Sequence, residues 1–129
     1  MTPGSDNDET KQIIMKYALL FHEKTEHFAR RSEPGFMDAW MAYITTLHAA
    51  GIFASGAGLL PPATATMVSV REGKRKVHDG PYPETKEFLG GLVVIEVPNL
   101  DVALEWAARS PAASYSSVEV RPLLPPHEA

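Results

Sequence analysis

The segment from Phe88 to Val97 restricts the fold more than any other part of the chain, because it is almost continuously apolar and rich in β-branched residues. Such a run is typical of a central strand that helices cover, whereas a half-exposed strand alternates apolar and polar residues. It is far shorter than the roughly 20 residues of a membrane-spanning helix, so we expect no membrane insertion. Gly90 and Gly91 within it predict a β-bulge or the close approach of another group.

Two amphipathic segments are expected to form the covering helices. The first has Ser32 as its N-cap and Pro34 in its first turn, and Gly51 suits a left-handed cap at its end. Its apolar side chains recur at helical spacing and form one face: Phe36, Trp40, Tyr43, Ile44 and Leu47. The second helix is capped by Asn99 and ends before Pro111. Both are predicted to pack on a sheet.

Five further segments have the composition of β-strands. They are residues 14–22, 52–60, 66–71, 74–78 and 115–124, and Glu72-Gly73 forms a turn between the third and the fourth. Residues 23–31 are expected to form a polar loop. The predicted order is β-α-β, a β-hairpin, then β-α-β. This is the split arrangement of a ferredoxin-like α+β domain, with both helices on one face of an antiparallel sheet.

Composition limits the kind of protein further. A chain of 129 residues fits one domain with a real core, here residues 14–124, between a mobile tail at 1–13 and a short C-terminal tail at 125–129. The absence of cysteine excludes disulfides and thiolate metal sites and favours a cytoplasmic protein. A net charge of −4 without a broad basic face argues against nucleic-acid binding.

Several short motifs are shared with a known family. They are Asp79-Gly80-Pro81-Tyr82, residues 61–66, residues 92–98, residues 101–109 and residues 118–122. This set resembles the YCII-related domain family, whose signature is Asp-Gly-Pro-Phe, here with Tyr82 in place of Phe. The resemblance covers residues 15–124. It implies a ferredoxin-like fold and a homodimer in which two sheets pack face to face as a dimeric α/β barrel, and it names no substrate.

Ionisable side chains are concentrated between the predicted hairpin and the apolar strand. Asp79-Gly80-Pro81 is a turn sequence, and a turn with a surrounding charge network is the structural interpretation. The functional interpretation is a small-molecule cleft with Asp79 as an acid or base. Tyr82, Glu84, Lys86 and Glu87 would then contact the substrate.

Three residues outside that segment are candidates for the same cleft. His22 ends the first strand and would pair with Asp79, which would fix its tautomer for proton transfer; otherwise it is a surface histidine. His78 either contacts the substrate or lies exposed on the hairpin. Arg121 either binds a substrate carboxylate or pairs with Glu119.

The remaining signals favour neither a metal nor a cofactor. The histidines show no paired spacing on a helix, His27 is expected in a loop, and no phosphate-binding glycine motif is present. Two functions stay open. One is a cofactor-independent enzyme that isomerises, eliminates from or hydrolyses a small molecule by acid–base chemistry. The other is a non-catalytic ligand-sensing or protein-interaction module, with a possible link to transcription regulation.

Overall fold

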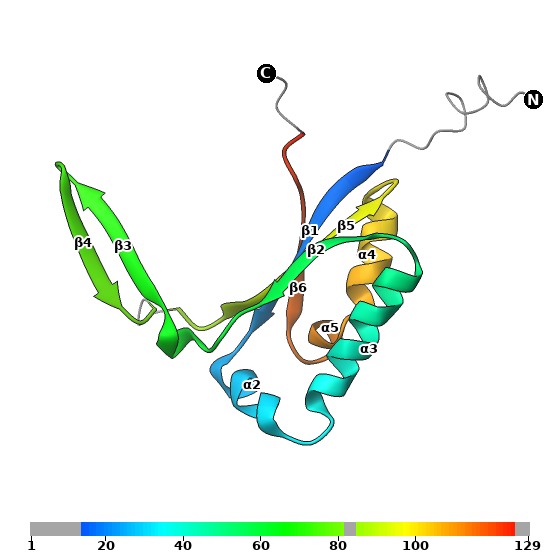
Figure 1. Ribbon diagram of the computed structural model, residues 1–129, viewed down its shortest axis with the longest axis horizontal. Helices are drawn as coiled ribbons and strands as arrows, with labels where there is room; N and C mark the ends of the chain where they lie inside the picture. Colours follow the sequence, from blue (N-terminus) through cyan, green and yellow to red (C-terminus); the bar gives the residue numbers. More distant parts are fainter. Residues whose placement is uncertain (1–13, 82–84, 126–129) are drawn as a thin grey trace, which may run out of the picture.

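A computed structural model describes residues 14–81 and 85–125 and has an antiparallel sheet with helices on one face (Figure 1). The sheet has the order β2 (Phe53–Gly58), β5 (Phe88–Val97), β1 (Met15–Glu23) and β6 (Ser117–Pro122). Each neighbouring pair is antiparallel. The apolar run is therefore confirmed as a central strand, β5, and the chain has an α+β fold.

Buried and partly buried side chains alternate along the two central strands, so the two faces of the sheet differ in burial. Tyr17, Leu19 and Phe21 of β1 are buried, as are Val93 and Ile95 of β5, and these side chains form the core beneath the helices. The side chains between them are only partly buried and lie on the opposite face. No helix within residues 14–81 and 85–125 covers that second face (Figure 1).

Three helices cover the inner face: α3 (Phe36–Ala49), α4 (Leu100–Ala108) and α5 (Pro111–Tyr115). The Asn99 cap is confirmed, because its Oδ1 accepts a hydrogen bond of 3.0 Å from the Val102 amide. Gly51 follows α3 with φ of +74°, as a left-handed cap requires. None of the helices in the described ranges is long and apolar enough to cross a membrane.

The predicted start of α3 at Ser32 is wrong. Arg30–Ser32 forms a separate 3-10 turn, and α3 begins only at Phe36. The cause is Pro34, whose ring disfavours helical geometry in the residue before it. Glu33 accordingly has extended geometry, with φ of −71° and ψ of 140°.

The predicted polar loop at 23–31 is also wrong. Strand β1 continues to Glu23, and α2 (Thr25–Ala29) follows it. His27 and Phe28 of this helix are buried, and the His27 ring lies 4.6 Å from the ring of Tyr115. The polar composition of residues 23–31 gave no indication of α2, because the position of this helix depends on contacts with a distant part of the chain.

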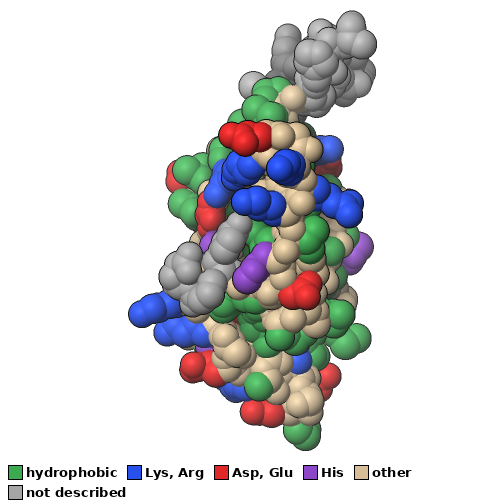
Figure 2. Space-filling view, turned by 90° about the vertical axis from the view of Figure 1, so that its left-hand side faces the viewer, with side chains coloured by type: hydrophobic (Ala, Val, Ile, Leu, Met, Phe, Trp, Pro, Cys, Tyr) green, Lys and Arg blue, Asp and Glu red, His purple; other side chains and the backbone are tan. Residues whose placement is uncertain are grey.

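The predicted hairpin is confirmed as β3 (Thr66–Arg71) and β4 (Lys74–Asp79), joined at Glu72-Gly73, both with positive φ. It forms a separate two-stranded sheet that extends away from the helical layer (Figure 1). Figure 2 shows the side from which it projects, with Lys and Arg side chains gathered in the upper half. Val68, Val70 and Val77 of the hairpin are 57–62% exposed.

The buried side chain of Tyr43 leads us to predict a loss of folding stability at alkaline pH. Tyr43 is buried and donates a hydrogen bond of 2.7 Å to the Trp106 carbonyl. Burial raises the pKa of Tyr43 from 10.0 to about 12, an effect that the nearby Arg109 partly opposes. A raised folded-state pKa gives stability below pH 10 that is lost as the pH rises towards 12, on the order of 1–3 kcal/mol. Urea unfolding of wild type and Tyr43→Phe between pH 8 and 12 measures this, and an equally steep alkaline loss in Tyr43→Phe would contradict it.

Candidate functional site

The described chain contains an apolar cavity of about 490 Å³ between α3 and the inner face of β2 and β5. Helix α3 contributes Met37, Trp40, Met41 and Ile44 to its wall. The sheet contributes two rings, Phe21 and Phe53, together with four glycines. Among the described residues that line it, the only charged ones are Glu23 and Arg31. The cavity therefore offers a mostly apolar surface with one polar corner.

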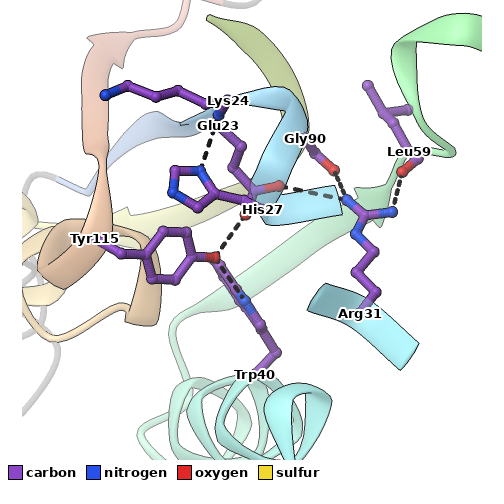
Figure 3. A network of polar contacts seen from close by, with 8 residues as sticks. All are labelled: Glu23, Lys24, His27, Arg31, Trp40, Leu59, Gly90 and Tyr115. Carbon is purple, nitrogen blue, oxygen red and sulfur yellow. Dashed lines mark hydrogen bonds and ion pairs between the residues drawn. The ribbon is translucent and has the colours of Figure 1, made fainter. Parts of the chain in front are cut away.

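Glu23 reaches this corner because it continues the alternation of β1. It follows Phe21 by two positions, so its side chain points to the helical side and is only 4% exposed. One carboxylate oxygen, Oε2, accepts a hydrogen bond of 2.6 Å from the Tyr115 hydroxyl (Figure 3). The other, Oε1, has no hydrogen-bond partner among the described residues. A buried oxygen without a hydrogen bond is rare in native proteins, and a catalytic role is among the explanations for one.

Arg31 supplies the opposing charge. Its Nη2 lies 3.5 Å from Glu23 Oε1, so the two form an ion pair without hydrogen-bond geometry. The guanidinium also donates to the Leu59 carbonyl and, at 3.0 Å, to the Gly90 carbonyl (Figure 3). Its carbon stands 4.7 Å from the centre of the Phe28 ring. Arg31 thereby joins the 3-10 turn to the ends of β2 and β5.

The two predictions for Gly90-Gly91 are both confirmed. The register of β1 against β5 shifts between Phe21 and His22, whose partners are Gly91 and Leu89, so Gly90 is the extra residue of a bulge. A Cβ atom on Gly90 would lie 2.2 Å from Glu23 Oε1. Only glycine lets the carboxylate lie against this strand.

Tyr115 and Trp40 fix the orientation of the carboxylate. Trp40 Nε1 donates to the Tyr115 hydroxyl at 3.2 Å, and that hydroxyl donates in turn to Glu23 (Figure 3). Burial, together with the hydrogen bond to Glu23, raises the pKa of Tyr115 far above its usual value, so the hydroxyl keeps its proton.

His27 Nδ1 accepts a hydrogen bond of 2.9 Å from the Lys24 amide, which places the proton of the neutral ring on Nε2.

His22 lies on the opposite face of the sheet and takes a different partner from the predicted one. Its Nε2 is 3.0 Å from Glu119 Oε1, and Arg121 Nε donates to Glu119 Oε2 at 2.8 Å. Arg121, and to a smaller extent His22, holds the pKa of Glu119 below its usual value. The structure thus joins His22 and Arg121 through Glu119.

The other predicted site residues lie neither in the α3 cavity nor beside the pair of His22 and Glu119. His78 and Asp79 lie exposed on β4, and Lys86 and Glu87 lie exposed just before β5. Lys86 lines a separate, more open hollow that it shares with Lys24 and Glu26 of the α2 region. Tyr82 and Glu84 lie outside the described residues. None of the described members of the predicted set lines the α3 cavity.

Sequence reasoning missed Glu23, Arg31 and Tyr115. For Glu23 a signal was present, because a carboxylate occurs where the alternation of Tyr17, Leu19 and Phe21 requires a core residue. For the other two no local signal existed. Tyr115 is 92 positions from Glu23 in the sequence, and only the fold brings them together.

The fold and the cavity define a small α+β protein with a buried glutamate beneath an apolar cavity. The chain belongs to the YCII-related domain family, whose model matches residues 15–126. It is also similar to an uncharacterized protein of Rhizobium meliloti (strain 1021), with 41% identity over 114 residues, which is 84% of this chain and 92% of that protein. The resemblance seen in the sequence motifs is therefore confirmed.

Proposed function

We propose that the protein binds a small, mostly apolar organic molecule in the α3 cavity, and that the Glu23 carboxylate accepts and returns a proton of that molecule. The observation that carries this proposal is Oε1 of Glu23, a buried oxygen without a hydrogen bond at the polar corner of the cavity. A ligand that donates to this oxygen would complete its hydrogen bonding.

The size and chemistry of the cavity support small-molecule binding. Its volume of about 490 Å³ lies within the roughly 300–1,000 Å³ of typical ligand pockets. Ligand pockets are mainly apolar and contain a few oriented polar groups, as this one does. Tyr115 and Arg31 keep Glu23 in one orientation, so the carboxylate is positioned before the ligand arrives.

The proton transfer needs no cofactor. Oε1 takes a proton from the bound molecule as a general base and gives it back to another atom of the same molecule as a general acid. Arg31 balances the negative charge of the carboxylate before the transfer, and the Tyr115 hydroxyl donates to its second oxygen throughout. This is the chemistry of an isomerase.

A matched pair of carboxylate-to-amide variants tests the proposal. In a thermal-shift screen of phenols, lactones and small carboxylic acids, we expect ligands of the wild type to lose most of their stabilising effect in Glu23→Gln. Asp79→Asn makes the same chemical change on the exposed hairpin and should leave the effect intact. The opposite result, with binding lost only in Asp79→Asn, would return the site to the 79–87 segment.

A non-catalytic ligand sensor is the second candidate, since the cavity is equally suited to binding without turnover. Incubation of each ligand from the screen in deuterated water separates the two. An enzyme of the proposed kind should exchange a carbon-bound proton of the ligand for deuterium faster than the solution does, and Glu23→Gln should abolish the exchange. A sensor should bind the same ligand without exchange.

We also propose that the protein is a homodimer in which the uncovered sheet face packs on a second copy, as in a dimeric α/β barrel of ferredoxin-like sheets. Leu20, Leu92 and Val94 are half-buried on that face, and the hairpin adjoining it has exposed valines. An apolar sheet face is stable when another layer covers it. Light scattering at micromolar concentration should give twice the mass of the 14.1 kDa chain, whereas a monomer would contradict the proposal.

A further inference from the structure

We infer that the α3 cavity takes a planar, uncharged aromatic molecule with one hydrogen-bond donor, such as a phenol. This inference rests on the proposed function and names its ligand class. Three features of the cavity carry it: a group of glycines in its wall, a buried acceptor beside them, and a compensated charge.

Four glycines form part of the sheet side of the cavity, beside the rings of Phe21 and Phe53. Gly56 and Gly58 of β2 and Gly90 and Gly91 of β5 line it, and Gly58 is paired with Gly91 in the ladder. A Cβ atom on Gly58 would meet nothing within 4 Å. The Phe53 ring and the Glu23 carboxylate already cover Gly56 and Gly90, so the surface free of side chains is at Gly58 and its partner Gly91. This surface can lie against the face of a flat ring.

The opposite wall carries the side chains that pack well against such a ring. Met37, Trp40 and Met41 face the glycines from α3, and Phe21 meets Trp40 edge to face at 4.7 Å. Thioether and aromatic groups both interact favourably with aromatic rings. A saturated ring of the same size is thicker and lacks these interactions.

The acceptor lies at the edge of the glycine wall. The position that a Cβ of Gly90 would occupy is 2.2 Å from Glu23 Oε1, so this oxygen lies directly against Gly90. It is nine-tenths buried and has no hydrogen bond, although Arg31 is 3.5 Å away. A ring lying on the wall would place a hydroxyl or an N–H group at its edge within reach of this oxygen.

The charges of Glu23 and Arg31 favour an uncharged ligand. An anion would meet the Glu23 carboxylate in a mostly apolar space, where an unpaired charge is costly. A cation would compete with Arg31, whose guanidinium already bonds the Leu59 and Gly90 carbonyls and pairs with Glu23. An uncharged donor leaves this balance undisturbed.

Calorimetric titration with three matched compounds tests the inference. They are beta-naphthol, its methyl ether, which lacks the donor, and decahydronaphthol, which keeps the donor but is not planar. We expect beta-naphthol to bind at least about tenfold more tightly than either of the others. Equal affinity of the methyl ether would overturn the donor requirement, and equal affinity of decahydronaphthol would overturn planarity.

Two variants assign the binding to this cavity. Gly58→Val fills the open space beside the wall and should weaken beta-naphthol at least about tenfold, with an unchanged melting temperature of the free protein. Gly58→Ala is the smaller substitute if Gly58→Val does not fold. Glu23→Gln should reduce the difference between beta-naphthol and its methyl ether to less than about threefold, because the charge-assisted hydrogen bond is lost. Beta-naphthol binding that both variants leave unchanged would place the ligand elsewhere and overturn the inference.

Failure of this inference is separable from failure of the proposed function. If decahydronaphthol binds as tightly as beta-naphthol and Gly58→Val weakens both, the cavity binds small molecules and only the ligand class is wrong. If none of the three binds but another compound shows Glu23-dependent stabilisation in the thermal-shift screen, the same conclusion holds. If no compound in either experiment binds, the proposed function fails as well.

Discussion

Arg31→Met should lower the free energy of unfolding by about 3–5 kcal/mol, because it leaves the Glu23 carboxylate buried without its counter-ion. The carboxylate is 4% exposed and lies in an apolar surrounding, so water cannot replace the guanidinium. The carbonyls of Leu59 and Gly90 lose a donor in the same variant. Urea unfolding at neutral pH measures the change.

The neighbouring arginine provides the matched control. Arg30 also pairs with a glutamate, since its Nε is 3.3 Å from Glu33 Oε1, and it also stands over a ring, that of Phe36. Both members of that pair are about half exposed, and exposed ion pairs contribute less than about 1 kcal/mol. Arg30→Met should therefore cost much less than Arg31→Met.

A second change distinguishes lost charge compensation from lost packing. In Glu23→Gln/Arg31→Met the buried group is neutral, so the double variant should recover most of the stability that Arg31→Met loses. If the double variant is as unstable as Arg31→Met alone, the cost comes from the carbonyl contacts or from packing on Phe28, and the ion pair is unimportant. Recovery would mean that the ion pair as a whole adds little net stability, so stability alone does not explain the buried carboxylate.

The parts of the fold that follow from local signals could be predicted from the sequence. The apolar run gave β5 with its bounds, Asn99 and Gly51 marked helix ends, and Glu72-Gly73 marked the hairpin turn. Each depends on a few neighbouring residues whose backbone preferences are strong. The start of α3 was wrong because Ser32 and Pro34 gave competing signals, and the effect of proline on Glu33 prevailed.

The α2 region shows why other parts could not be predicted. Its polar composition indicated a loop, yet His27 and Phe28 are buried there. What holds His27 is the ring of Tyr115 and the backbone of Lys24. The first of these contacts joins segments far apart in the chain, and no pattern within 23–31 contains it.

The candidate site in the α3 cavity could not be predicted from the density of charged residues along the chain. The charged residues at 79–87 are adjacent in sequence, but those described are exposed. The polar corner of the cavity instead combines Glu23, Arg31 and Tyr115 from three separate elements. His22 was predicted to pair with Asp79, whereas the structure places its Nε2 3.0 Å from Glu119 Oε1. Gly90 was the one predicted feature that points directly to the site.

Gly90→Ala should destabilise the protein by about 1–3 kcal/mol, because the added methyl group would overlap the Glu23 carboxylate. The Cβ atom would lie 2.2 Å from Oε1 and 2.7 Å from Cδ, and the hydrogen bond to Tyr115 hinders the side chain from moving away. Backbone conformation adds nothing to this cost, since Gly90 is not among the glycines with positive φ. Chemical denaturation measures it.

Glu23→Ala identifies the cause of that cost. Once the carboxylate is removed, Gly90→Ala should cost less than about 0.5 kcal/mol, and the cycle should give a coupling energy of at least about 1 kcal/mol. Gly91→Ala is the control, because its Cβ would lie 2.9 Å from the backbone oxygen of Ala57, which Glu23→Ala does not move. Its cost should be the same in both backgrounds. Additive effects of Gly90→Ala and Glu23→Ala would mean that the carboxylate does not rest on Gly90, and the acceptor would then not stand over the glycine wall where a ligand ring could reach it.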